Sequence, residues 1–195
     1  MFIQVIQGRT GDAAGLRRQF DRWNSEIGPS AGGFLGSTGG VADDGTFVEI
    51  VRFADEAAAR ANSERTEQGA WWNETEKFFD GDVGFRDSTD VEEPLGPGSD
   101  KAGFVQVMQG RVTDRAKLDE IERGFVENLR PQRPDLLGSV RAWDGDFFTE
   151  AIYFSTEAEA REAERNMAPD ALDELNAVIT EPAFIDLKDP WLFTK

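Results

Sequence analysis

Apolar and polar residues alternate at the start of the chain. One side of the alternation carries Ile3 and Val5, and the other side carries Phe2, Gln4 and Ile6. A period of two is typical of a β-strand. Farther along, apolar residues recur at the spacing of one helix face, at Leu16, Phe20, Trp23 and Ile27. The pattern therefore predicts a strand followed by a helix that packs a single apolar stripe on a sheet.

The same reasoning predicts the elements that follow. A strand through residues 34–41 leads to a turn signal at residues 43–45, a returning strand at 47–53, a helix from 55, a further helical piece at 67–79 and a last strand at 83–87. Glycine-rich residues 32–40 lack the lysine and the helix of a phosphate-binding loop, so they are interpreted as an irregular strand. The order β-α-β-β-α-β is the ferredoxin-like motif.

The chain contains this unit twice. FIQVIQGR at residues 2–9 returns as FVQVMQGR at residues 104–111, with six of the eight positions identical. A tandem duplication predicts that the fold of one unit is the fold of the other. We therefore expect a ferredoxin-like repeat at 1–90, a linker rich in proline, glycine and acidic residues at 91–102, and a second repeat with a C-terminal tail at 103–195.

The first helix of the second repeat also has a single apolar stripe, made of Leu118, Ile121, Phe125 and Leu129. Helices of this kind cover one face of each sheet, so the second faces of the two sheets are expected to cover each other. This predicts an α+β protein in which one chain is a monomer with an internal pseudo-dimer, and further oligomerisation is left open. The tail carries Trp191, Leu192 and Phe193 and is too apolar for a free terminus, so we expect it to pack across the other repeat.

The net charge of the chain limits the classes of molecule that it is expected to bind. Lys and Arg total 21 against 38 Asp and Glu, a formal net charge of −17. Such a field repels polyphosphates and anionic lipid surfaces, so nucleic acid and membrane partners are not expected. The start of the chain lacks the pattern of a signal peptide, and no apolar run approaches the length of a membrane span. The chain is expected to be cytoplasmic.

Two residue types are missing, and their absence excludes several kinds of chemistry. The sequence has no Cys and no His. This excludes disulfides, Ser-His-Asp and Cys-His nucleophile systems, the usual zinc sites and histidine-ligated haem. The acidic pair Asp43 and Asp44 lacks the spacing of a calcium loop and is interpreted as turn chemistry. We expect no metal and no cofactor.

The order of elements, the run FADEAAARANSE at 53–64, and the endings GFRD at 84–87 and AFID at 183–186 resemble the dimeric α+β barrel superfamily, in particular its antibiotic-biosynthesis-monooxygenase-like group. The resemblance implies that the two ferredoxin-like repeats close into a barrel within one chain. Known members include cofactor-independent quinol monooxygenases, isomerases and haem-degrading enzymes. The asparagine, tryptophan and histidine of the haem-degrading members fall near Gln4, Ala61 and Ala70, so that activity is not expected.

Four polar residues recur at matching strand positions in the two repeats. Gln4 corresponds to Gln106 on the first strand, and Glu49 corresponds to Glu150 on the third. We assign them to the face that would line the barrel, where burial would raise a glutamate pKa toward neutrality and suit it to acid–base work. The alternative is that each pair is only exposed or internally hydrogen-bonded.

Arg9 ends the first strand and could hold an acidic substrate at the mouth of a barrel by two hydrogen bonds. Its alternative role is structural, as the partner of a nearby carboxylate such as Asp12 or Asp87.

An aromatic cluster distinguishes the repeats. Trp71, Trp72 and Asn73 have no aromatic counterpart in the second repeat. This asymmetry favours one working pocket, in the first repeat. The resemblance implies the same, since tryptophan and asparagine bind a planar substrate and polarise its oxygen in cofactor-independent oxygenases of the group. The alternative is that the tryptophans only fill the core.

The function that these features favour is binding of a small apolar or aromatic molecule, with cofactor-independent monooxygenation or isomerisation of an aromatic or polyketide-like substrate as the leading enzyme class. Catalytic candidates are Gln4, Glu49 and Asn73, and substrate-binding candidates are Trp71, Trp72, Arg9, Gln106 and Glu150. The alternative is a non-catalytic binding or stress-related protein.

Overall fold

The computed structural model describes residues 1–128, 130–166 and 169–195. Leu129, expected to continue the apolar stripe of the second-repeat helix, lies outside them. The described chain forms two compact units. The first comprises Met1–Val91 together with Asp189–Lys195, and the second comprises Glu92–Lys188. Each unit is described by itself below.

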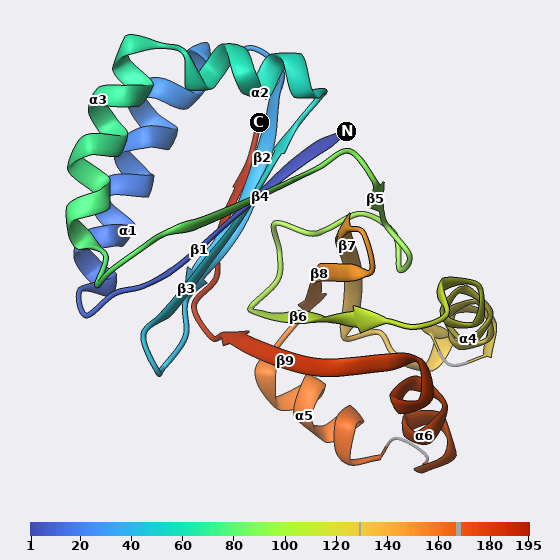
Figure 1. Cartoon of the computed structure of the whole chain (residues 1–195). Coiled ribbons are helices and arrows are strands. Elements are labelled where there is room, and N and C mark those ends of the chain that lie inside the picture. Colours follow the sequence, from blue (N-terminus) through green and yellow to red (C-terminus); the bar gives the residue numbers. More distant parts are fainter. Residues whose placement is uncertain (129, 167–168) are drawn as a thin grey trace. The chain divides into compact units, whose positions relative to one another are not determined.

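The first unit is built on a five-stranded antiparallel sheet in the order β10-β2-β3-β1-β4. Its strands are β1 (Phe2–Arg9), β2 (Phe34–Val41), β3 (Thr46–Phe53), β4 (Gly84–Ser88) and β10 (Trp191–Thr194). The edge strand β10 comes from the C-terminus and pairs with β2, and Figure 1 shows the C-terminal end beside the strands of this unit. The prediction that the apolar tail packs on the other repeat is confirmed.

The helices of the first unit are α1 (Ala13–Arg22), α2 (Glu56–Ser63) and α3 (Thr66–Thr75), with a π-helical turn over Trp23–Ile27 that extends α1. Asp12 caps α1 by accepting a hydrogen bond from the Gly15 backbone N–H at 2.8 Å, and Asp55 caps α2 in the same way at Ala58. Caps of this kind satisfy donors that the first helical turn leaves free. Helices α1 and α3 lie side by side in Figure 1.

The helices bury one face of this sheet in an aromatic core. Phe20 of α1 contacts the rings of Phe47, Trp71 and Trp191 at centroid distances of 5.3, 5.4 and 5.7 Å. The strand residues of this core include Phe2 and Ile6 of β1, so the even positions of β1 face the helices. The predicted alternation along the first strand is confirmed.

The structure corrects one prediction about this sheet. Strand pairing places Gln4 opposite Val51 and Ile6 opposite Glu49, and directly paired residues share a face. Gln4 and Glu49 therefore lie on the side that the helices cover. Their predicted placement on the face that lines the barrel is wrong, because that opposite face carries the residues Ile3, Val5, Val48 and Ile50.

The second unit repeats the architecture, with strand order β5-β7-β8-β6-β9. Its strands are β5 (Val91–Glu92), β6 (Phe104–Val112), β7 (Leu136–Asp144), β8 (Phe147–Phe154) and β9 (Ile179–Leu187). Its helices are α4 (Arg115–Asn128), α5 (Glu157–Arg165) and α6 (Pro169–Val178). The predicted α+β class and its two ferredoxin-like repeats are confirmed. The short edge strand β5 comes from the segment that joins the repeats.

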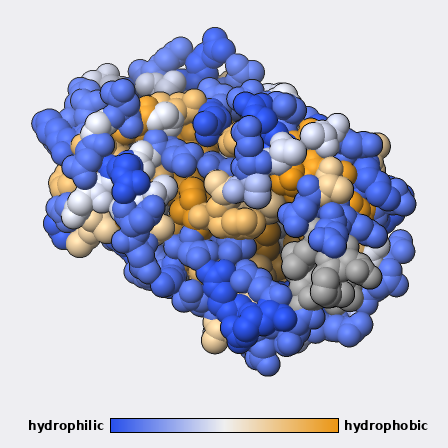
Figure 2. Space-filling view, turned by 60° about the horizontal axis from the view of Figure 1, so that its bottom comes forward, coloured by the Kyte–Doolittle hydropathy of each residue, from blue (hydrophilic) through white to orange (hydrophobic). Residues whose placement is uncertain are grey.

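Charged and polar side chains cover most of the face drawn in Figure 2, as expected for a chain with a net charge of −17. Within the described ranges, no helix is long and apolar enough to cross a membrane.

The exchanged tail generates a stability prediction. Trp191 is 3% exposed and packs on Phe20 and Phe47. Removing a buried tryptophan side chain costs about 3 to 5 kcal/mol, so Trp191→Ala should lower the free energy of unfolding by that amount in urea titrations. Thr194→Ala, an exposed change in the same strand, should alter it by less than about 0.5 kcal/mol. Equal effects of the two changes would show that the tail does not support the core.

Candidate functional site

A row of paired residues crosses the helix-covered face of the first sheet. Strand pairing sets Trp191 opposite Gly39, Gly39 opposite Glu49, and Glu49 opposite Ile6. The hairpin of β2 and β3 and the distant strand β10 therefore bring a glycine, a carboxylate and a tryptophan together. Phe47, two residues before Glu49 on β3, also faces the helices, so the surroundings of the carboxylate are largely apolar.

Glu49 is the unusual member of this row. Its side chain is 0% exposed, and neither carboxylate oxygen has a hydrogen-bond partner in the described part of the chain. The carboxylate lies over Gly39, since a Cβ atom built on that glycine would stand only 1.8 Å from Glu49 Oε2. The absence of a side chain at residue 39 is therefore what makes room for the carboxyl group.

Burial raises the pKa of Glu49 from 4.5 to about 8. The physical cause is the loss of water around the charged form. Ser37 and the Arg52 guanidinium oppose the rise, but the effect of burial outweighs both. Glu49 is thus protonated at neutral pH, and it can give up its proton near pH 8.

The equivalent carboxylate of the second repeat is held quite differently. Glu150 is paired across the strands with Arg141, whose Nη2 and Nε lie 2.6 and 2.9 Å from Glu150 Oε2. Both side chains are almost completely buried, at 3% and 5% exposure. A buried carboxylate bonded to a guanidinium is fixed in place.

Arg141 also anchors two further carboxylates. It is ion-paired with Glu122 of α4, and its Nη1 lies 3.5 Å from Glu92 of β5. Burial opposes the charge of Arg141, but Glu150 and Glu122 outweigh that effect and hold its pKa above the ordinary value. Burial likewise raises the pKa of Glu122. The second repeat therefore fills this region with a network of ions.

One substitution between the repeats accounts for the contrast. Gly39 occupies the position that Arg141 occupies in the second repeat, as the strand partner of the glutamate. Without the arginine, Glu49 lacks this ion pair and keeps its proton. We did not single out this difference from sequence, although aligning the repeats pairs the two residues.

The matching glutamines serve their own sheets. Gln4 Nε2 donates to Asp87 Oδ1 at 2.8 Å, and Gln106 Nε2 donates to Asp186 Oδ1 at 3.0 Å. Each amide thus links the first strand of its repeat to the last one. The structure does not bring Gln4 and Glu49 into hydrogen-bond contact.

Arg9 has a structural partner, but not one of those expected. Its Nη2 donates to the Asp44 backbone carbonyl at 2.5 Å, and its Nη1 lies 3.9 Å from the Asp44 carboxylate. The expected partners Asp12 and Asp87 are instead engaged with the cap of α1 and with Gln4. Arg9 therefore braces the β2–β3 turn.

The tryptophan pair of α3 divides between core and surface. Trp71 is buried, and its Nε1 donates to the Gln19 backbone carbonyl at 2.8 Å. Trp72 is half-buried and contacts Phe85 at a centroid distance of 5.2 Å. Asn73 is exposed. Trp71 thus belongs to the core, as the alternative interpretation held, and Asn73 is not brought close to the row around Glu49.

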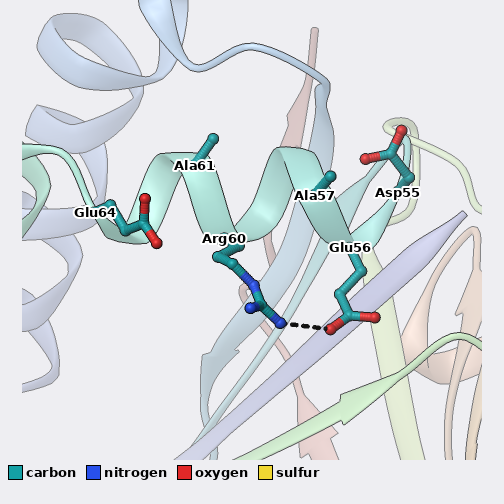
Figure 3. Close-up of a pocket in the computed structure, with 6 residues that line it drawn as sticks. All are labelled: Asp55, Glu56, Ala57, Arg60, Ala61 and Glu64. Carbon is teal, nitrogen blue, oxygen red and sulfur yellow. Dashed lines mark hydrogen bonds and ion pairs between the residues drawn. The ribbon is translucent and has the colours of Figure 1, made fainter.

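Clefts open on the described surface of the first unit. One runs along α2 and is lined by Asp55, Glu56, Ala57, Arg60, Ala61 and Glu64. Figure 3 shows these residues on a single helix, with Arg60 directed at Glu56. Another, of about 460 Å³, lies beside Trp191. No cluster of ligating side chains that could hold a metal ion occurs among residues 1–128, 130–166 and 169–195.

The raised pKa of Glu49 predicts how stability depends on pH. The unfolded chain releases this proton near pH 4.5 and the folded chain near pH 8. The contribution of Glu49 to the free energy of unfolding should therefore be greatest below pH 4.5. It should fall by on the order of 4 kcal/mol as pH rises toward 8, and level off above pH 8. Urea unfolding of the parent and of Glu49→Gln isolates this contribution, because other groups cancel. The variant should gain stability relative to the parent between pH 5 and 8. A constant difference would contradict the shift.

The ion network predicts a second result. Arg141→Met leaves buried carboxylates without a cation, so the free energy of unfolding at pH 7 should fall by about 3 to 5 kcal/mol. Arg111→Met is a matched control in the same sheet, because Arg111 pairs with Asp146 at the exposed surface. Its cost should stay below about 1 kcal/mol. Similar losses in both variants would argue against a structural role for the network.

Comparison with solved structures places the fold. A candidate monooxygenase from Fusobacterium nucleatum superimposes with a TM-score of 0.78 over 100% of this chain and 94% of its own, at 12% identity. An anthrone oxidase-like protein gives 0.65 over 100% and 91%, at 11% identity. No protein-family model and no curated protein matches the sequence.

A third structure carries the link to the group named above. It is an uncharacterised ferredoxin-fold protein of Listeria monocytogenes, related to antibiotic biosynthesis monooxygenases, with a TM-score of 0.50 at 9% identity over 100% of this chain and 95% of its own. These proteins are of similar length, so the likeness spans both repeats. The predicted resemblance is confirmed at the level of the fold: the chain has the doubled ferredoxin-like fold of monooxygenase-like proteins.

Proposed function

We propose that the chain is a cofactor-independent monooxygenase or isomerase for a small aromatic or polyketide-like molecule, with Glu49 as its acid–base group. The observation that carries this proposal is the unpaired, fully buried carboxyl of Glu49, with its pKa near 8, in contrast to the ion-paired Glu150 at the equivalent position of the second repeat. A proton-transfer group is most effective when its pKa lies near the working pH. A glutamate with only a structural role does not require an unpaired carboxyl group or a raised pKa.

The oxygenase form of the proposal uses dioxygen as the oxidant. The Glu49 carboxylate takes a proton from the acidic C–H or O–H of an anthrone- or quinol-like ring, and the resulting anion gives electrons to dioxygen. For an anthrone, one oxygen atom becomes the new carbonyl, and the other leaves as water with the two hydrogens of that carbon. The likeness to an anthrone oxidase-like protein supports this substrate class.

Other residues have smaller parts in the proposal. Gln4 is bonded to Asp87 and Asn73 is exposed, so neither is given a role in proton transfer. Arg9 and Gln106 are likewise engaged in structural contacts. Trp191 adjoins Glu49 through Gly39 and belongs to the short edge strand β10. A substrate reaches the carboxyl only when this edge moves.

A second candidate is a non-catalytic binding protein. The complete enclosure of Glu49 favours it, because a carboxyl that is 0% exposed has no direct contact with solvent or substrate. The two candidates differ in whether a bound aromatic compound is turned over.

The proposal is tested by oxygen uptake with hydroxylated anthrones and quinols, measured above the uncatalysed rate. The parent rate should rise with pH to a plateau above about pH 8, as Glu49 loses its proton. Glu49→Gln should lower the rate by about a hundredfold or more and remove this pH dependence.

Glu150→Gln is the matched control, with its fold checked by near-ultraviolet circular dichroism, and it should keep the parent rate. An unchanged rate in Glu49→Gln would refute the role of this carboxyl. Binding of these compounds without oxygen uptake or isomerisation by the parent would favour the non-catalytic candidate.

A further inference from the structure

The cleft beside Trp191 combines small apolar residues with a tryptophan and an ion pair. It is lined by Ala13, Ala14 and Arg17 of α1, Val41 at the end of β2, and Asp189 and Trp191 of the tail. All of these residues belong to the first unit. Its volume of about 460 Å³ is in the range of small-molecule sites.

The second repeat shows what fills the same place there. Val41 pairs with Phe47, and Trp143 pairs with Phe148, so Val41 and Trp143 are equivalent. In the second repeat the Trp143 ring lies 5.6 Å from that of Phe148 and is 4% exposed. Replacing an indole by an isopropyl group at this position removes most of a planar ring from the space.

A second replacement enlarges the cleft. Ala13 follows the cap residue Asp12 by one position, as Arg115 follows Asp114. The Arg115 guanidinium stacks over Trp143 at 4.3 Å from the ring centroid. The first repeat thus lacks both members of a stacked indole and guanidinium pair. Ala13 and Val41, the residues equivalent to this pair, both line the cleft.

The polar groups of the cleft suit an anion. The Arg17 guanidinium carbon lies 5.7 Å from the Trp191 ring centroid, and Arg17 Nη1 lies 3.0 Å from Asp189 Oδ2. The Asp189 side chain is 90% exposed. Exposed ion pairs contribute little, so a ligand carboxylate or phenolate can displace Asp189 at low cost. Arg17 then binds the anion, and the aromatic wall binds the ring.

We propose that the cleft formed by Ala13, Arg17, Val41 and Trp191 binds a planar fused-ring compound with an anionic oxygen. The ring takes the place that Trp143 takes in the second repeat, and the oxygen pairs with Arg17. Trp191 lies both in the wall of this cleft and in the row that contains Glu49. A ligand bound in the cleft therefore contacts a residue of that row. This site shares the aromatic substrate class of the proposed function.

The test uses 2-naphthoate as the probe, titrated into the full chain by calorimetry and by amide chemical shifts. Val41→Trp should refill the cleft as Trp143 does and weaken binding by about tenfold or more. Ala14→Trp fills it from the helix side and should have the same effect. Ala57→Trp adds the same side chain at the cleft on α2 and should leave the affinity unchanged (Figure 3).

Charge variants test the anion contact. Arg17→Gln should weaken 2-naphthoate by about five- to tenfold but leave neutral 2-naphthalenemethanol unaffected, whereas Asp189→Asn should strengthen 2-naphthoate. Glu49→Gln should bind the probe like the parent, so a failure of the acid–base proposal would not disturb this result. Parent affinity in both Val41→Trp and Ala14→Trp would overturn the site, as would no binding to the parent.

Discussion

A carboxylate inside a protein needs either a cation or hydrogen-bond donors to stay ionised, and for Glu49 the effect of burial outweighs those of Ser37 and Arg52. This constraint shapes the first repeat. The carboxyl group lies over Gly39, where no other residue would leave it room, and aromatic side chains of α1, β3 and the tail close around it. The proton that it retains at neutral pH follows from that packing and from the missing counter-ion.

The duplication provides an internal control for this interpretation. The two repeats share strand order, helix positions and the glutamate itself, so differences in chemistry trace to a few replacements. Arg141 turns the second glutamate into one arm of a buried ion network. In the second repeat, Trp143 and Arg115 stack on each other at the positions equivalent to Val41 and Ala13, which line the cleft of the first repeat. The second repeat contains a buried ion network, while the first contains a neutral carboxylic acid and a cleft.

Sequence alone accounts for most of the fold. The period-two pattern of β1, the apolar stripe of α1 and the repeated FIQVIQGR motif predict the elements and their duplication, and the apolar tail predicts its own packing. Alternation shows which residues share a face of a strand but not which face the helices cover, so Glu49 was assigned to the wrong side. The partner of Arg9 depends on the β2–β3 turn, which local sequence does not determine.

The expected effect of burial on Glu49 is found, and the roles of the candidate site residues stay predictions. Burial of Glu49 was expected to raise its pKa, and it does. The aromatic asymmetry between the repeats favours the first repeat, and our proposals for that repeat rest on the differences at Gly39 and Val41. Aligning the two repeats pairs Gly39 with Arg141 and Val41 with Trp143. The sequence does not show that strand pairing puts each of these residues opposite the glutamate or a phenylalanine near it.

The most direct test of this account is a carbon-13 NMR titration of the glutamate side-chain carboxyls, with the Glu49 signal identified by its loss in Glu49→Gln. The account predicts that this carboxyl titrates near pH 8 in the folded chain. Titration near its ordinary pKa of 4.5 would show that water or a cation reaches the group, and it would contradict the central claim.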